Sequence, residues 1–259
     1  MHHQMKLNEQ PFRALQAGYK SIELRLNDEK RQKLQIGDEI TFTCIPHPEE
    51  TITKTIKALH RFADFAELFA VLPLLKCGET PFSLPEAKPE KMNAYYSEEQ
   101  QKKYQALGIE LEEVPLQRFL AGQTGAMPYC SGYETALAEI RSGQKKTHWI
   151  WYLLPMIKGL TPDMVTEYYA LENKREAREF LHHPVLGARL LEMTEALLQL
   201  QNSDPVSVFG LTDAYKFRSC MTLFSEIAPE QHIFQDALSK FCLDIKDEQT
   251  LQILSYDKS

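Results

Sequence analysis

The first half of the chain alternates between apolar and polar positions over several short stretches. In one of them, Ile22, Leu24 and Leu26 share one face, while polar side chains occupy the other. A period of two is typical of a half-buried strand, and β-branched residues reinforce it in two later stretches. The pattern predicts strands at residues 5–7, 20–26, 39–45, 51–59 and 107–111.

Helix signals separate these strands. Gly18 follows a short helical pattern and is expected to end it, as glycine commonly does at the C-terminus of a helix. Asp64 and Ser97 are placed to cap two further helices, the second ending near Tyr104. Residues 73–91 contain four prolines and are expected to form a loop or lid. Short strands with small helices between them favour a compact, partly closed β-barrel.

Residues 116–259 lose the alternation and carry helix signals instead. Helix starts are expected at Asn173 and at Thr161, where Pro162 would be the first helical residue. Apolar side chains recur at helical spacing, as in the set Leu186, Leu190, Met193 and Leu197. The pattern predicts an all-α bundle with little or no sheet.

The change of pattern near Pro115 divides the chain into expected domains at residues 1–114 and 115–259. The expected fold class is α+β, a β-barrel domain followed by an all-α helical bundle. Residues 1–114 contain 15 basic and 18 acidic residues, and the whole chain has a net charge of −7, so neither half is a basic arm. This charge argues against coating long duplex nucleic acid, but it allows a local pocket for a base, a nucleotide or a short single strand.

The composition is that of a packed soluble protein, with 43% hydrophobic and 25% charged residues among 259. No apolar run reaches the length of a membrane span. The five cysteines are scattered and never have a Cys-x-x-Cys spacing, which fits a reducing cytoplasm and predicts no structural metal site or disulfide framework. We therefore expect a cytoplasmic protein with no membrane contact, no metal and no cofactor.

Three charged side chains, Lys20, Glu23 and Arg25, gather where the first helix leads into a strand. Turns held by a packed sheet often carry function, so a site is expected here. Strict alternation places Lys20 on the face opposite Glu23, so the two can share a pocket only if the turn or a bulge rotates Lys20. The alternative is a solvated row of salt bridges.

The residues around this turn resemble a known family. The run Gly18-x-Lys20-x-x-Glu23-x-Arg25 is similar to the core of the activating-signal-cointegrator homology (ASCH) domain, and the resemblance covers residues 5 to about 113. It implies a barrel similar to the PUA fold, a pocket beside the helix-to-strand turn and a link to RNA. It also implies candidate activities, since some small bacterial members deacylate N4-acetylcytidine and others cut RNA. The deacylating members use a lysine with a hydroxyl residue where this chain has Glu23.

The resemblance and the residue types together give a candidate site. Lys20 and Glu23 are the candidate catalytic residues, because a carboxylate can accept from the exocyclic amine of a base or take a proton from water. A lysine that stays charged can hold a phosphate or polarise a carbonyl. The candidate ligand-binding residues are Ser21, Arg25, Tyr95 and Tyr96. The rings of the two tyrosines offer a stacking surface. If Lys20 is a surface-type residue, Lys20→Ala should cost no more than about 0.5 kcal/mol of stability.

The second half contains an unusual density of aromatic residues. The run Thr-His-Trp-Ile-Trp-Tyr occupies residues 147–152, and residues 209–224 contain the pattern Phe-Gly-x-x-Asp-x-x-Lys-Phe-Arg-Ser-x-Met-Thr-Leu-Phe. Together these resemble the all-helical bacterial domain of unknown function 1810 (DUF1810), over a match from about Leu116 to Leu254. The resemblance implies a fold and no activity.

His148, Lys216 and Arg218 are the candidate pocket residues of this second half. In the functional interpretation they converge on an anionic ligand such as a nucleotide. In the structural interpretation Arg218 pairs with a buried carboxylate, Asp213 or Glu139. Both tryptophans of the aromatic run are expected in the core, since buried indoles stabilise small bundles.

These observations favour a protein that recognises RNA or a nucleobase, with RNA or a nucleoside-type small molecule as its partner. Hydrolysis of a modified nucleoside or of RNA is the candidate activity. The alternative is a non-catalytic RNA-binding or adaptor protein whose helical half is the interaction module, and a third hypothesis places an enzymatic pocket in that half. The chain has no serine-hydrolase elbow, phosphate-binding glycine-rich loop or zinc-type cluster.

Overall fold

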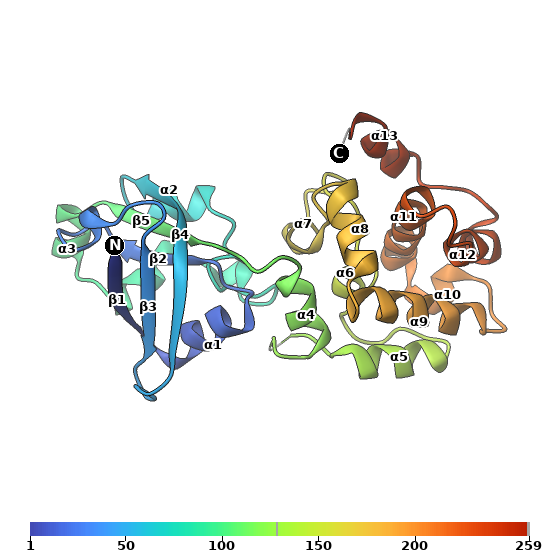
Figure 1. Ribbon diagram of the computed structural model, residues 1–259, viewed down its shortest axis with the longest axis horizontal. Coiled ribbons are helices and arrows are strands. Elements are labelled where there is room, and N and C mark those ends of the chain that lie inside the picture. The colour runs from blue at the N-terminus through green and yellow to red at the C-terminus, as the bar shows by residue number, and fades with distance from the viewer. Residues whose placement is uncertain (128, 258–259) are drawn as a thin grey trace. The chain divides into compact units, whose positions relative to one another are not determined.

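The computed structural model describes residues 1–127 and 129–257 and divides the chain into two compact units, Met1–Gln117 and Arg118–Ser259 (Figure 1). The first unit is built on a curled sheet and the second is helical, so the α+β fold expected from the sequence is confirmed. Within the described residues, no helix combines the length and the apolar character that a membrane span requires.

One five-stranded sheet organises the described part of the first unit. Its strands are β1 (His2–Leu7), β2 (Ile22–Leu26), β3 (Glu39–Cys44), β4 (Thr51–Phe62) and β5 (Ala106–Leu111). Their order is β1-β3-β4-β5-β2, with β1 parallel to β3 and the other neighbours antiparallel. A register shift between Ile56 and Ala58 interrupts the β4–β5 ladder, as a bulge does in a bent strand. The sheet curls into a half-barrel, in agreement with the PUA-like barrel that the resemblance implied.

Local signals set the ends of the helices in this unit, which are α1 (Glu9–Ala17), α2 (Phe65–Val71) and α3 (Glu98–Lys103). Gly18 ends α1 at a φ of +83°, a conformation that favours glycine. Asp64 accepts a hydrogen bond of 2.8 Å from the backbone N–H of Glu67, and Ser97 forms a capping box with Gln100. All three predicted helix ends are confirmed.

The proline-rich segment between α2 and α3 folds into turns and two short 3₁₀ helices, Leu84–Glu86 and Pro89–Ala94. We call residues 73–96 the lid segment. Met92 of this segment lies in a buried apolar cluster with Phe65 and Leu68 of α2 and with Ile22 of β2. A separate cluster packs α1 onto the sheet. The lid segment is therefore anchored on the sheet by apolar packing.

The second unit consists of helices. They are α4 (Gln117–Gln123), α5 (Tyr133–Arg141), α6 (Ile150–Leu153), α7 (Met164–Tyr169), α8 (Lys174–His182), α9 (Leu186–Leu198), α10 (Pro205–Phe209), α11 (Leu211–Ile227), α12 (Ile233–Cys242) and α13 (Glu248–Tyr256). An isolated bridge between Ile157 and Leu171 is the β pairing seen in its described residues. The predicted all-α character is confirmed.

Two predicted helix starts in this unit had different outcomes. Asn173 caps α8 as predicted, accepting a hydrogen bond of 2.9 Å from the backbone N–H of Glu176. The prediction for α7 was wrong by two residues, because Asp163 is the N-cap and Pro162 lies outside the helix. The carboxylate of Asp163 accepts from the N–H of Thr166 at 2.9 Å, the contact that favours aspartate at a helix start.

The core of the second unit follows the helical spacing in the sequence. The predicted apolar stripe of α9 is fully buried, and it consists of Leu186, Leu190, Met193 and Leu197. Trp149 is also fully buried, whereas Trp151 is only partly buried. The prediction that both tryptophans belong to the core is therefore confirmed for Trp149 alone.

Candidate functional site

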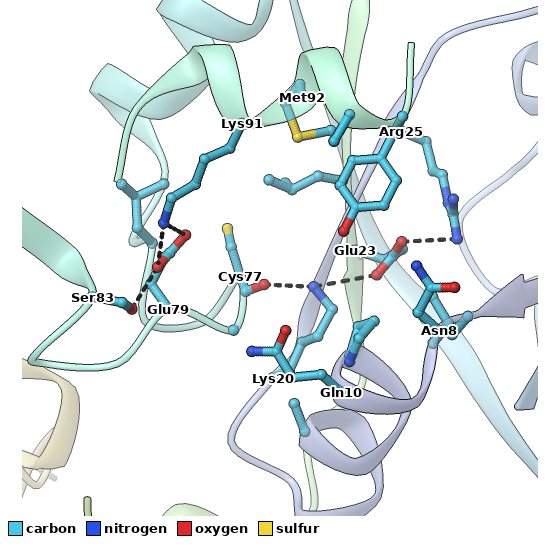
Figure 2. Close-up of a pocket in the computed structure, with 18 of the residues that line it drawn as sticks. Asn8, Gln10, Lys20, Glu23, Arg25, Cys77, Glu79, Ser83, Lys91 and Met92 are labelled. Atoms are coloured by element: carbon cyan, nitrogen blue, oxygen red, sulfur yellow. Dashed lines mark hydrogen bonds and ion pairs between the residues drawn. The ribbon is translucent and has the colours of Figure 1, made fainter. Parts of the chain in front are cut away.

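A cavity of about 690 Å³ lies in the first unit, beside the turn that joins α1 to β2 (Figure 2). Its wall is built from the end of β1, the start of α1, the middle of β2 and the lid segment. Volumes of 300–1,000 Å³ are typical of small-molecule sites in proteins. The cavity therefore has the size of a ligand site, at the place where the sequence predicted one.

Lys20 is buried in the wall of this cavity, with 5% of its side chain exposed. Its ammonium donates to the backbone carbonyls of Ile22 at 2.8 Å and of Cys77 at 2.5 Å. It also lies 3.2 Å from Oε2 of Glu23, whose side chain is 8% exposed. The three donor positions of an ammonium are thus matched by three acceptors.

Alternation does not separate Lys20 from Glu23, because Lys20 lies outside the strand. β2 begins at Ile22, so Lys20 belongs to the preceding turn, and its side chain extends along the start of the strand to the carbonyl of Ile22. The expectation that Lys20 is a surface-type residue was wrong, because burial and three acceptors make it part of the packed structure.

Arg25 lies on the other side of the Glu23 carboxylate. Its Nη2 is 3.0 Å from Glu23 Oε1 and donates to the backbone carbonyl of Lys6 at 2.9 Å, which joins β2 to β1. Burial works to lower the pKa of Arg25, but Glu23, with Tyr96 and Tyr95, raises it above its ordinary value. Glu23 is therefore fixed between two cations in the cavity wall.

Both candidate tyrosines line the cavity, in different environments. Tyr96 stacks on Phe65, with ring centroids 5.9 Å apart, and packs against the apolar cluster of α2. Tyr95 is 59% exposed. Tyr95 is therefore the ring that can accept a stacked ligand, whereas Tyr96 forms part of the wall.

Ser21 was expected to bind the ligand, but it does not line the cavity. Its hydroxyl donates to Oε1 of Glu113 at 2.8 Å, and Lys76 donates to the same oxygen at 2.7 Å. Strict alternation would place Ser21 on the same face as Glu23, but β2 begins only at Ile22 and the Ser21 hydroxyl is held by Glu113, so its contacts are structural.

Sequence reasoning found Tyr95 and Tyr96 of the lid segment but missed other lid residues that line the cavity. Cys77, Glu79, Ser83 and Lys91 all line it. Burial raises the pKa of the Cys77 thiol to about 12, although Lys20 works to lower it. The only sequence signal for this group was the presence of charged residues within a proline-rich segment, which does not by itself indicate where they point.

In the second unit, the candidate residues do not all converge. The ring of His148 stacks on Trp151, with centroids 6.1 Å apart, and Lys216 Nζ lies 5.1 Å from the Trp151 ring centroid. Arg218 instead lies 5.4 Å from the ring centroid of Tyr215 and 3.7 Å from Asp247 Oδ1. The expected three-residue pocket is therefore not assembled.

The predicted carboxylate partners of Arg218 were wrong because other donors occupy both. Asp213 pairs with Lys145 at 2.7 Å and with Lys216 at 3.0 Å. Glu139 accepts hydrogen bonds from the loop that follows α5, among them one of 2.8 Å from Trp149 Nε1.

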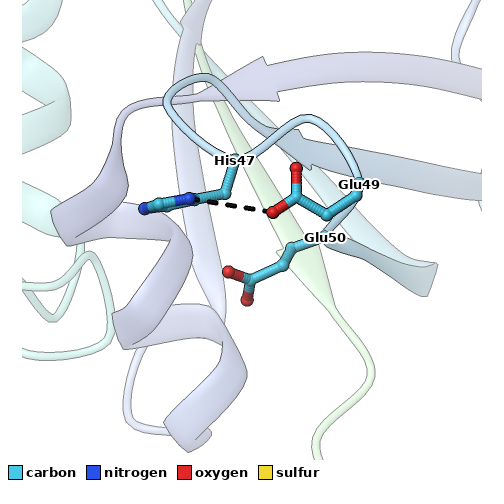
Figure 3. Close-up of side chains that lie close together, drawn as sticks. All are labelled: His47, Glu49 and Glu50. Atoms are coloured by element: carbon cyan, nitrogen blue, oxygen red, sulfur yellow. Dashed lines mark ion pairs between the residues drawn. The ribbon is translucent and has the colours of Figure 1, made fainter.

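A histidine and two glutamates lie close together in the turn between β3 and β4 (Figure 3). Their ligand atoms, from His47, Glu49 and Glu50, all fall within 4.8 Å of one another. Arg13 donates to both oxygens of Glu50, one of these bonds being 2.8 Å long. A cation bound there would have to displace this guanidinium, so the cluster is explained by ion pairing.

Comparison with known protein families finds a match for each of the two units. The sequence profile of the protein of unknown function family DUF1810 matches residues 113–254, more than half of the chain. The chain belongs to the DUF1810 family. The ASCH domain profile matches residues 5–115, so this DUF1810 protein carries an N-terminal ASCH domain, as the two resemblances implied. The ASCH domain suggests RNA binding, whereas DUF1810 carries no assigned function.

Three solved structures are similar to parts of this DUF1810 protein. The conserved hypothetical protein Rv1873 from Mycobacterium tuberculosis is 31% identical, over 54% of this chain and 96% of that one, with a TM-score of 0.51. The hypothetical protein PH0355 is 29% identical, over 44% of this chain and 100% of that one, with a TM-score of 0.37. Protein PF0455 from Pyrococcus furiosus is 30% identical, over 44% and 98%, with a TM-score of 0.35. The comparison with curated proteins found no match.

Proposed function

We propose that the first unit recognises a nucleobase, free as a nucleoside or within a short RNA, and that Glu23 is the residue that contacts the base. The observation that carries this proposal is the row Lys20–Glu23–Arg25 in the cavity wall, where two cations fix one carboxylate (Figure 2). The ASCH domain's general association with RNA supports the same ligand class.

A carboxylate is selective among bases because, when ionised, it only accepts hydrogen bonds. It pairs with the exocyclic amino group of cytosine or adenine, as glutamate does with cytosine N4. Uracil presents a carbonyl oxygen at the corresponding position, which would face Glu23 with like partial charge. The apolar wall at Phe69, Leu74 and Met92, with the exposed ring of Tyr95, gives the base flat surfaces to stack on.

In this arrangement Lys20 is a positioning residue. Its three donors are used by two backbone carbonyls and Glu23, so it presents no free amine to act as a base. Glu23 is the group that can take a proton from water. Hydrolysis of a modified base is thus the second candidate function. It is favoured by the place of Glu23 in the cavity wall, because this carboxyl, after taking a proton from water, can return it to the leaving amine.

Nucleoside binding measured by calorimetry tests the first function. Cytidine and adenosine should bind about tenfold more tightly than uridine, since one hydrogen bond to a charged group contributes roughly 1.5–3 kcal/mol. Glu23→Gln should remove this preference, because an amide both donates and accepts. Glu98→Gln is the matched control, since Glu98 is exposed and lies outside the cavity. Equal affinities for all three nucleosides would reject Glu23 as the base-recognising residue.

Incubation with N4-acetylcytidine, followed by chromatography, tests hydrolysis. Release of cytidine by the parent and not by Glu23→Gln would support catalysis. Binding without release would support the alternative, a non-catalytic RNA-binding protein in which the helical unit is the interaction module.

A further inference from the structure

The proposed base contact uses only one end of the cavity. Figure 2 shows a second polar group, Lys91 with Glu79 and Ser83, on the other side of Cys77 from the Lys20–Glu23–Arg25 row. Lys91 Nζ donates to both oxygens of Glu79, at 3.0 and 3.2 Å. This second group belongs entirely to the lid segment and has no part in recognition of the base.

The lid holds the Lys91 ammonium in a defined place. The Ser83 hydroxyl donates to Glu79 Oε2 at 2.6 Å. The turn at residues 80–83, directly after Glu79, is closed by two reciprocal hydrogen bonds. Thr80 N–H donates to Ser83 Oγ at 2.8 Å, and Ser83 N–H donates to Thr80 Oγ1 at 3.0 Å. Glu79 is therefore fixed before any ligand arrives, and it fixes Lys91 in turn.

Unlike Lys20, Lys91 remains available to a ligand. Its side chain is 43% exposed, and a single carboxylate is its partner in the described residues, so its ammonium keeps a donor that faces neither Glu79 oxygen. An exposed lysine in a plain surface ion pair contributes little to stability. Its place in the cavity wall is what distinguishes Lys91 from such a residue.

The charge of the cavity wall also differs from that of the chain. Its cationic residues are Lys6, Lys20, Arg25 and Lys91, and its carboxylates are Glu23 and Glu79. The wall is therefore net positive, in a chain whose net charge is −7. A cleft of one sign concentrates ligands of the other sign, so this cavity favours an anion over a neutral nucleoside.

We infer that Lys91 contacts a phosphate, and that the ligand is a nucleotide whose base lies at Glu23 and whose sugar phosphate lies at the group formed by Lys91, Glu79 and Ser83. This inference rests on the proposed recognition of a base and adds the phosphate to it. The phosphate is that of a nucleoside monophosphate or of a phosphodiester in a short RNA. The cavity volume of about 690 Å³ leaves room for sugar and phosphate beside the base.

Calorimetry on the full chain tests this with cytidine, its 5′- and 3′-monophosphates, the trinucleotide CpCpC and ribose 5-phosphate. One monophosphate should bind about tenfold more tightly than cytidine, the effect of one charge-assisted contact. Lys91→Gln should abolish that advantage and leave cytidine binding unchanged. Lys102→Gln, which removes a charge from a side chain that is 80% exposed and outside the cavity, should retain it.

A measurement on the parent protein alone gives a second test. The second ionisation of a phosphate monoester lies near pH 6, so the monophosphate gains a negative charge between pH 5 and 7.5. Its advantage over cytidine should therefore grow several-fold across that range. Tighter binding of CpCpC than of either monophosphate would identify RNA as the source of the phosphate, and weaker binding would identify the free nucleotide.

The outcomes separate this inference from the proposed function. Equal binding of cytidine and both monophosphates at each pH would overturn the phosphate contact and leave base recognition standing. Binding of ribose 5-phosphate that depends on Lys91, without binding of any nucleoside, would support the phosphate contact and reject base recognition. Failure of every ligand to bind would overturn both.

Discussion

The ammonium of Lys20 lies 3.2 Å from the carboxylate of Glu23, and both side chains are almost fully buried. The same ammonium donates to the carbonyl of Cys77 in the lid segment and to the carbonyl of Ile22 at the start of β2. One lysine therefore joins the strand, the lid and the carboxylate that lines the cavity. In the proposed site, folding stability and ligand recognition would depend on the same buried charges.

Lys20→Ala should destabilise the first unit by about 3–5 kcal/mol, the range for breaking a buried ion pair. The loss is large because Glu23 keeps Arg25 as its one ion-pair partner among the described residues and two backbone carbonyls lose the Lys20 donor. Urea denaturation of the full chain measures it. Lys102→Ala is the control and should change stability by no more than about 0.5 kcal/mol. A Lys20→Ala protein as stable as its parent would show that Lys20 is not required for folding.

The thiol of Cys77 should react slowly with iodoacetamide in the native protein. Burial raises its pKa to about 12, so at pH 8 the reactive thiolate is scarce. We expect alkylation more than about a hundredfold slower than that of an unperturbed cysteine, whose pKa is near 8.5. Mass spectrometry of peptides after timed labelling, with and without urea, measures the rate. Equal rates in the two conditions would mean that water reaches the thiol freely.

Sequence patterns predicted the sheet and the helix ends well, because these depend on neighbouring residues. Gly18, Asp64 and Asn173 each end or begin a helix through contacts within four positions of themselves. The start of α7 was misplaced because two capping residues two positions apart, Thr161 and Asp163, compete, and only the packed structure shows that Asp163 is the N-cap.

The site was only partly predictable, for a physical reason. Lys20 and Glu23 are three positions apart, and motif resemblance identified both. The lid partner of Lys20, the carbonyl of Cys77, is 57 positions away and was not found. The lid has no period, so nothing in its sequence indicates which side chains face the cavity. The error on Ser21 also has a long-range cause, since its hydroxyl donates to Glu113, which is 92 positions away.

The two units should fold separately if the chain is cut after Gln117, and the position of the cut should matter. Gln117 Nε2 donates to the carbonyl of Ala17 at 3.3 Å, and its side chain packs directly on Gly18, where an added Cβ would overlap Gln117 Cγ. A fragment of residues 1–117 should be about 1 kcal/mol more stable than one of residues 1–114, the usual net contribution of a hydrogen bond. Thermal melting of both fragments, beside residues 118–259, measures this. Aggregation of every fragment from a soluble parent would contradict the division.

The second unit should lose stability in acid through Glu139. Burial works to raise the pKa of this carboxyl, but hydrogen bonds from the backbone of Lys146, the indole of Trp149 and the backbone and hydroxyl of Thr147 lower it below its usual value. A depressed folded-state pKa stabilises the protein above the unfolded-state pKa, about 4.3 for glutamate. That contribution is fully present at pH 7 and is lost as the pH falls below about 4 and passes the folded-state pKa.

Glu139→Gln should isolate this contribution, because it keeps the shape of the side chain and removes the charge. The amide can still accept from the backbone donors, while the Thr147 hydroxyl can rotate to accept from the new NH₂ group. We expect a loss of about 1–3 kcal/mol at pH 7, the value of hydrogen bonds to a charged acceptor, and a smaller difference from the parent at pH 3. Urea denaturation at pH 7, 5 and 3 measures both, with Glu134→Gln, an exposed change on the same helix, as the control. The loop at residues 143–149 leads into α6. If the difference in unfolding free energy between the parent and Glu139→Gln stays constant with pH, the charge of Glu139 does not stabilise this loop.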